Sequence, residues 1–117
     1  MMGNFREAGK TGEYQDGSKK RVDIEGQEIL LARVGDKFYA VSNRCTHLGG
    51  KLSKGVLEGK IITCPLHGSQ FDVTTGEALR WLKGSGLLAA VMKVIRPPRP
   101  LKTYNVKIEG DTIYIEV

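Results

Sequence analysis

Short runs in which apolar and polar residues alternate, separated by turn-forming residues, recur along most of this chain. A period of two residues is the pattern of a half-buried β-strand. The runs lie at residues 19–26, 27–34, 37–42, 60–63, 70–73, 101–109 and 112–117, with turn signals at Gly35-Asp36, Thr75-Gly76 and Gly110-Asp111. Short strands joined by such turns predict an all-β fold, an antiparallel sandwich or small barrel.

One segment departs from the strand pattern. Residues 87–95 are apolar except for Lys93, and Pro97 follows as a helix stop. The apolar positions recur at helical spacing: Leu87, Leu88, Val91, Val94 and Ile95. This segment predicts a short helix near 87–95, which is too short to span a bilayer.

Composition adds limits on size, location and partners. A length of 117 residues fits one domain, so we expect residues 1–117 to fold as a single unit. The first residues have no signal-peptide pattern, and the chain has no apolar run long enough for a membrane anchor, which favours a soluble protein of the cytoplasm. The net charge of +5 favours partners with acidic surfaces, although solubility alone would also explain it.

All the cysteines and histidines of the chain lie in one stretch, "CTHLGGKLSKGVLEGKIITCPLHG", residues 45–68. The two pairs, Cys45 with His47 and Cys64 with His67, form the pattern C-x-H-x16-C-x2-H. A disulfide would leave both histidines unexplained, and a reducing compartment disfavours it. Two sulfurs and two nitrogens suit structural zinc, but zinc pairs are usually spaced two to four residues apart and ordered differently. A [2Fe–2S] cluster with mixed cysteine and histidine ligands is the third possibility; if the two cysteines hold one iron and the two histidines the other, each loop gives one ligand to each iron.

The motif and its flanks resemble Rieske proteins. The similarity extends into "VGDKFYAVSNRCTHLGG", "CPLHGSQFDVTTGEAL" and "PLKTYNVKIEGDTIYIEV" and leaves out residues 81–96. It implies a Rieske-like β-sandwich or barrel with a cluster-binding subdomain at about residues 43–78. It also implies one Rieske-type cluster, with Cys45 and Cys64 on one iron and His47 and His67 on the other.

The residues around the motif predict how the cluster is held and tuned. Gly49, Gly50 and Gly68 allow close backbone approach in the ligand loops. By resemblance, Ser69 supplies a hydroxyl near the cluster, whereas Phe71 replaces a second hydroxyl donor. Respiratory Rieske proteins carry a disulfide between the loops, and Gly50 and Leu66 stand where its cysteines would be. We therefore expect a midpoint potential in the lower half of a window of about −150 to +300 mV.

We weigh three functions for a Rieske chain of this size. The first is a soluble one-electron carrier, not itself an enzyme, that passes electrons from a reductase to a terminal oxygenase or another oxidoreductase. A complete oxygenase is excluded because its mononuclear iron would need two further histidines. The third is a small subunit of a larger reductase, similar to nitrite reductase, in which the apolar segment would contact a partner or a second copy through Leu87, Leu88, Val91, Met92, Val94 and Ile95.

Basic residues flank the predicted cluster loops: Arg44, Lys51, Lys54 and Arg99. They are either a solvated face or a basic ring that steers an acidic partner toward the cluster. No motif for nucleic-acid binding accompanies them.

Overall fold

The computed structural model describes residues 4–44, 50–65, 68–80 and 100–117. Within these ranges the elements are β-strands and two short 3₁₀ helices. The strands are β1 (Phe5–Lys10), β2 (Lys19–Ile24), β3 (Gln27–Val34), β4 (Lys37–Ser42), β5 (Val56–Glu58), β6 (Ile61–Thr63), β7 (Gln70–Asp72), β8 (Ala78–Arg80), β9 (Thr103–Tyr104), β10 (Val106–Glu109) and β11 (Thr112–Glu116). The 3₁₀ helices are η1 (Thr11–Glu13) and η2 (Leu52–Lys54).

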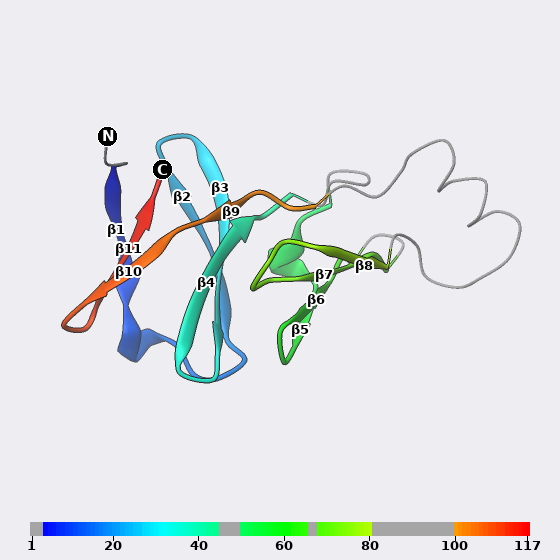
Figure 1. Ribbon diagram of the computed structural model, residues 1–117, viewed down its shortest axis with the longest axis horizontal. Helices are drawn as coiled ribbons and strands as arrows, with labels where there is room; N and C mark the ends of the chain where they lie inside the picture. Colours follow the sequence, from blue (N-terminus) through cyan, green and yellow to red (C-terminus); the bar gives the residue numbers. More distant parts are fainter. Residues whose placement is uncertain (1–3, 45–49, 66–67, 81–99) are drawn as a thin grey trace, which may run out of the picture.

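The strands form three antiparallel sheets, ordered β1-β11-β10, β2-β3-β4-β9 and β5-β6-β7-β8. Figure 1 shows the first two sheets side by side and the third beside them. The third sheet lies next to the described residues that flank positions 45–49 and 66–67. The prediction of an all-β antiparallel fold is therefore confirmed. The limits of one domain at 1–117 and of a subdomain at about 43–78 stay predictions.

The tight turns lie where the sequence predicts them. Val34 pairs with Lys37 across Gly35, whose φ is 63°. Glu109 pairs with Thr112 across Gly110, whose φ is 62°. Both glycines therefore adopt the left-handed backbone conformation that a two-residue hairpin turn needs.

The run at 101–109 is not one strand. It breaks at Asn105, because β9 pairs with β4 of the second sheet and β10 pairs with β11 of the first. The carbonyl of Asn105 accepts a hydrogen bond from the N–H of Glu116 at 2.9 Å. The segment thus links two sheets, which a single uninterrupted strand would not do.

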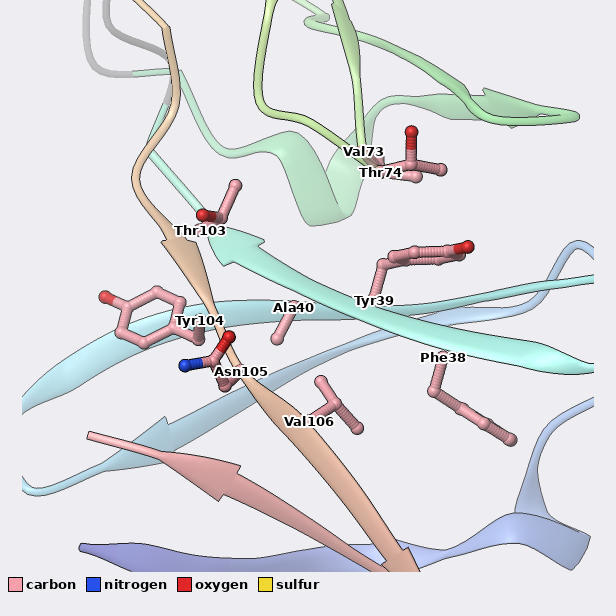
Figure 2. Close-up of a pocket in the computed structure, with 9 residues that line it drawn as sticks. All are labelled: Phe38, Tyr39, Ala40, Val73, Thr74, Thr103, Tyr104, Asn105 and Val106. Atoms are coloured by element: carbon pink, nitrogen blue, oxygen red, sulfur yellow. The ribbon is translucent and has the colours of Figure 1, made fainter. Parts of the chain in front are cut away.

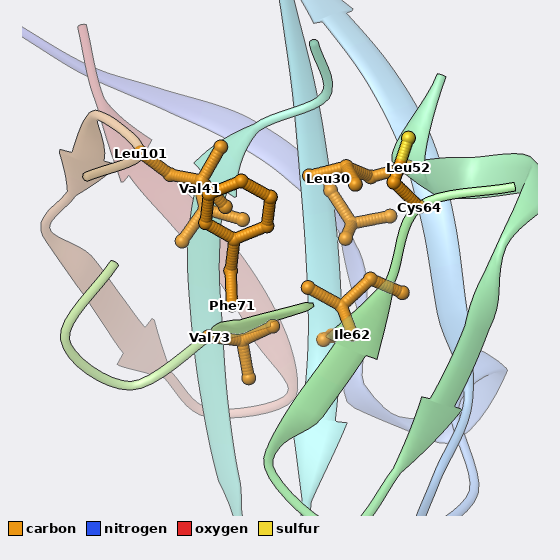
Figure 3. Close-up of a cluster of buried hydrophobic side chains, with 9 residues drawn as sticks. Leu30, Val41, Leu52, Ile62, Cys64, Phe71, Val73 and Leu101 are labelled. Atoms are coloured by element: carbon orange, nitrogen blue, oxygen red, sulfur yellow. The ribbon is translucent and has the colours of Figure 1, made fainter. Parts of the chain in front are cut away.

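Strand β3 is the centre of the core. Four of its eight residues, Ile29–Ala32, are fully buried, because both faces of the strand are covered. Leu30 and Ala32 belong to one cluster of buried side chains, and Ile29 and Leu31 belong to another. The first cluster, drawn in Figure 3, also contains Cys64 and Phe71, so the same core supports the sheet and the start of the second ligand segment.

Three strands were not predicted: β1, β5 and β8. They are short or weakly apolar, and each forms by pairing with a neighbour, β1 with β11, β5 with β6 and β8 with β7. The predicted helix at 87–95 lies outside the described residues. In the described part of the chain, no helix is long and apolar enough to cross a membrane.

Candidate metal centre

The structure describes part of the predicted site. Of the four candidate ligands it describes Cys64; Cys45, His47 and His67 lie outside the described residues, as do Gly49 and Arg99. The other predicted site residues are described: Gly50, Gly68, Ser69, Arg44, Lys51 and Lys54. We call residues 45–50 the first loop and residues 65–68 the second loop.

Cys64 follows directly after β6 and is 2% exposed. Strand β6 lies between β5 and β7, which holds the end of the strand on both sides. The Cys64 N–H donates to the Ser69 carbonyl at 2.7 Å, so the two ends of the second loop are joined by a backbone hydrogen bond. The sulfur is thus carried by a rigid part of the fold, and Pro65 immediately after it is exposed.

The second loop returns into the core through Gly68 and Ser69. Gly68 has a φ of 71°, a conformation that favours glycine, as its predicted role requires. Ser69 is fully buried, and so is Phe71 two residues later. Phe71 packs in the same cluster of side chains as Cys64.

The two ends of the first loop are pinned together. Arg44 and Lys51 form an isolated antiparallel β-bridge, and Gly50 beside them is buried. The N–H of Leu52 donates to the Asn43 carbonyl at 2.8 Å. The Asn43 side chain accepts a further hydrogen bond through Oδ1 from the Ser53 N–H at 2.7 Å, which ties the end of β4 to η2.

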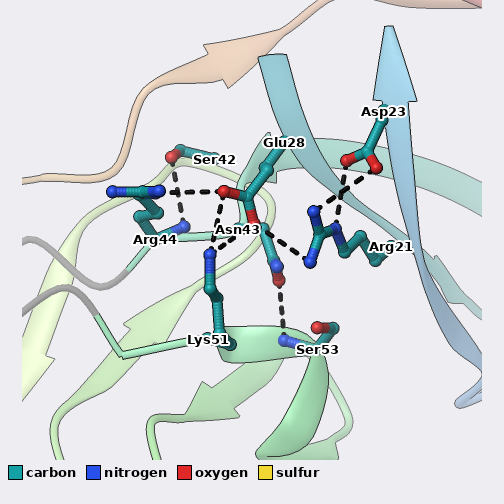
Figure 4. A network of polar contacts seen from close by, with 8 residues as sticks. All are labelled: Arg21, Asp23, Glu28, Ser42, Asn43, Arg44, Lys51 and Ser53. Atoms are coloured by element: carbon teal, nitrogen blue, oxygen red, sulfur yellow. Dashed lines mark hydrogen bonds and ion pairs between the residues drawn. The ribbon is translucent and has the colours of Figure 1, made fainter. Parts of the chain in front are cut away.

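Glu28, at the start of β3, contacts the cations on both ends of the first loop (Figure 4). Lys51 Nζ lies 2.7 Å from Oε1 and 2.8 Å from Oε2, and Arg44 Nε lies 3.1 Å from Oε2. Arg21 adds an ion pair at 3.4 Å. The hydrogen bond from Lys51 is the main cause that lowers the pKa of Glu28 to about 2; burial opposes it, and Arg44 and Arg21 reinforce it. The carboxylate is therefore ionised at any physiological pH.

A second carboxylate, Asp72, supports the turn between β7 and β8 of the third sheet. Asp72 is buried, and its Oδ1 accepts hydrogen bonds from the N–H and the hydroxyl of Thr74 at 2.8 and 2.6 Å. Burial raises the pKa of Asp72, but the hydrogen bonds from Thr74 and Lys60 outweigh it and lower the pKa overall. The same turn also holds the segment that leads into β9, because the Leu101 N–H donates to the Gly76 carbonyl at 2.7 Å.

The described residues fit a metal cluster with soft ligands. A thiol at the end of a fixed strand, buried in the core, suits a thiolate ligand to iron. In the described part of the chain, Asn43 Nδ2 is a buried side-chain donor with no hydrogen-bond partner, at the base of the first loop. An unused donor next to a segment that carries two predicted ligands is consistent with such a site.

Described residues line two hollows of the surface. One, of about 290 Å³, lies between β4, the Val73-Thr74 turn and residues 103–106, as Figure 2 shows. The other, of about 370 Å³, is lined by polar side chains, including Glu28 and Arg44. Among the described residues that line them there is no candidate ligand, so neither adds to the metal site.

Comparison with known proteins decides the family. The model of the Rieske [2Fe-2S] domain matches residues 4–89. The chain belongs to the Rieske [2Fe-2S] family. It is 41% identical over 105 residues to the ferredoxin component of the naphthalene 1,2-dioxygenase system of Pseudomonas aeruginosa, covering 90% of this chain and 88% of the relative. It is 39% identical to the corresponding component of Pseudomonas putida over 117 residues, covering 100% of this chain and 99% of the relative.

Solved structures agree with this family. The ferredoxin of carbazole 1,9a-dioxygenase from Nocardioides aromaticivorans IC177 has a TM-score of 0.79 and 27% identity, over 96% of each chain. A ferredoxin bound to oxygenase in a carbazole 1,9a-dioxygenase complex has a TM-score of 0.77 and 30% identity, over 96% of this chain and 92% of that one. The Rieske chain described here is thus an electron-transfer component with a Rieske-type [2Fe–2S] cluster, and it is not an enzyme by itself.

Sequence reasoning missed Glu28, Asn43 and Asp72. Asn43 lies two residues before Cys45, and its nearness to the motif is the one signal that would have singled it out. Asp72 and Glu28 carry no such signal, because their contacts depend on how the chain folds.

Proposed function

We propose that Cys45, His47, Cys64 and His67 hold the cluster, with both cysteines on one iron and both histidines on the other. The spacing of the four residues and the burial of Cys64 at the end of β6 support this assignment. The closure of the second loop between Cys64 and Ser69 supports it further. When bound, the cluster supplies reversible one-electron chemistry.

Electron paramagnetic resonance of the reduced protein tests the ligand set. A reduced [2Fe–2S] cluster is paramagnetic and gives a spectrum, whereas Zn²⁺, with a filled d shell, gives none; a colourless, zinc-loaded protein would overturn the assignment. Replacing His47 or His67 by alanine should abolish this spectrum. Since every histidine of the chain is in the motif, retention of the spectrum in either variant would exclude that residue as a ligand.

We also propose that the protein carries electrons in the cytoplasm from a reductase to the terminal oxygenase of an aromatic-ring dioxygenase system. The names of its relatives, which are ferredoxin components of naphthalene and carbazole dioxygenase systems, support this role. The test is reconstitution: the purified protein should restore electron flow between such a reductase and oxygenase. A carrier that is reduced by the reductase but never reoxidised by the oxygenase would argue against this role.

The basic residues near the loops support partners with acidic docking surfaces, but they are not equivalent. Arg44 and Lys51 are paired with Glu28, which cancels part of their charge. Lys54 is exposed, and within the described residues no ion pair involves it. Arg99 lies outside the described residues. We therefore propose Lys54 as the described cation that contributes most to steering, with Arg44 and Lys51 contributing less.

A further inference from the structure

The contacts of Glu28 join parts of the chain that are distant in sequence. Its side chain reaches Arg44 and Lys51, the residues immediately before and after the first loop. Its backbone carbonyl accepts a hydrogen bond from the N–H of Asn43 at 3.1 Å. One residue of β3 therefore holds the base of the first loop through both its main chain and its side chain.

Most ion pairs at a protein surface contribute little, because the side chains are mobile and well solvated. Glu28 differs in three respects. Its side chain is 17% exposed, both of its carboxylate oxygens are used, and it stands on a strand that pairs with β2 on one side and β4 on the other. The carboxylate is therefore a fixed point to which the two cations are drawn.

The neighbouring charges make the carboxylate necessary. Arg21, Arg44 and Lys51 all contact Glu28, and of these three cations Arg21 also pairs with Asp23. Without its negative charge, these like charges would repel each other across the base of the loop. Arg44, with a side chain 65% exposed, is free to swing into solvent when its partner is lost.

We propose that Glu28 is a positioning residue for the cluster: its carboxylate draws Arg44 and Lys51 together and thereby fixes the ends of the loop that carries Cys45 and His47. The proposal rests on the proposed function, because it assumes that the first loop supplies two ligands. It assigns Arg44 and Lys51 a structural role in addition to any role in docking.

Asp23 provides a matched control. It is the register partner of Glu28 across β2 and β3, and its side chain pairs with Arg21. No described contact joins it to Arg44 or Lys51. Asp23→Asn and Glu28→Gln remove the same charge from adjacent positions. Only Glu28→Gln removes the charge that contacts the two ends of the first loop.

The experiment compares four loaded proteins: wild type, Glu28→Gln, Glu28→Asp and Asp23→Asn. The rate of cluster loss is followed by visible circular dichroism in the presence of an iron chelator, and the reduced proteins are examined by electron paramagnetic resonance. Glu28→Gln should lose its cluster about tenfold faster or more, the effect of one charge-assisted hydrogen bond, and its g values should shift or broaden. Glu28→Asp keeps the charge but is one methylene shorter, so it should also lose the cluster faster than Asp23→Asn, which should match wild type.

Equal behaviour of Glu28→Gln and Asp23→Asn in both measurements would overturn the proposal, because it would show that only net charge matters. A wild-type rate of cluster loss for Glu28→Asp would also overturn it, since a negative charge too short to contact Arg44 and Lys51 would then be enough to retain the cluster. Far-ultraviolet circular dichroism of each variant separates these results from general unfolding. A wild-type protein without a Rieske spectrum would refute the ligand assignment itself, which is a different failure.

Discussion

Replacing Gly55 by alanine should distort the strand end that carries Cys64. Gly55 follows η2 and donates its N–H to the Leu52 carbonyl at 2.9 Å. A Cβ atom at this position would overlap the carbonyl oxygen of Thr63, the residue before Cys64. Because the obstacle is backbone rather than a flexible side chain, either η2 or the end of β6 must move.

Overpacking of this kind costs about 1–3 kcal/mol. For a protein of this size, each kcal/mol of lost stability lowers the melting temperature by about 4 °C, so Gly55→Ala should melt about 4–12 °C below wild type. The cluster's visible circular dichroism should change as well, because the displaced carbonyl is adjacent to Cys64. The melts are run on loaded protein at one scan rate, since cluster loss makes unfolding irreversible.

Gly12→Ala is the control, because nothing lies within 4 Å of the Cβ that it would add and its φ is not in the left-handed range. It should melt close to wild type. If Gly55→Ala melted together with Gly12→Ala and kept the wild-type cluster spectrum, the backbone at Thr63 would have to be far more compliant than its position between paired strands implies. The reasoning from close packing would then be wrong.

Three further predictions follow from the site. Asp72, whose pKa is lowered, stabilises the fold above the pKa of an ordinary aspartate and loses that contribution as the pH falls through its own pKa. Asp72→Asn should therefore show a smaller drop in melting temperature between pH 6 and pH 3 than wild type, because that range includes the ordinary aspartate pKa of about 3.9, near which the loss begins; an equal drop would contradict this assignment. Lys54→Ala should slow electron transfer to the oxygenase at low salt but leave the rate unchanged at high salt. Lys37→Ala, at the opposite end of β4 from the loop, is the control and should leave the rate unchanged at both; a wild-type rate that is indifferent to ionic strength would contradict the steering hypothesis. The midpoint potential of wild type should lie in the lower half of the window, below about +75 mV, and a value above about +200 mV would refute this prediction. Phe71→Tyr should raise the potential by about 40 mV, the one-electron equivalent of a hydrogen bond of about 1 kcal/mol; an unchanged or lower potential in the variant would show that the added hydroxyl does not reach the cluster.

The strands that sequence could predict are those whose side-chain pattern and turns are local. The hairpins around Gly35 and Gly110 carry both signals, and they formed as expected. Strand β1 carries neither, because its partner β11 lies at the other end of the chain and its own residues are partly exposed. Strand β8 follows the turn predicted at Thr75-Gly76 and pairs with the neighbouring β7, but its three residues are too few to show an alternating pattern. The break at Asn105 is similarly hidden, since residues on both sides alternate in the same way and only the pairing with two different sheets separates them.

The candidate site shows the same contrast between local signals and contacts that depend on the fold. The four ligands form two short motifs, each pairing one cysteine with one histidine, and chemistry restricts what two cysteines and two histidines can bind, so the sequence alone indicates a cluster. The residues that support them are not close in sequence: Glu28 lies 16 residues from Arg44 and 23 from Lys51. A glutamate beside an apolar strand is ordinary, and nothing in its neighbours shows that β3 begins where the first loop closes.

This distance changes what the basic residues near the motif mean. From the sequence, Arg44 and Lys51 form part of a positive rim, and their charge favours an acidic partner. In the structure, both are bound to one carboxylate whose pKa lies far below neutral, so their charge is partly cancelled at every pH at which the carrier works. Attraction of a partner then depends more on cations outside this group, and Lys54 is the described candidate near the loop. A count of charges along the chain therefore overstates the basic field at the cluster, because folding brings a carboxylate from β3 to the two residues that enclose the first loop.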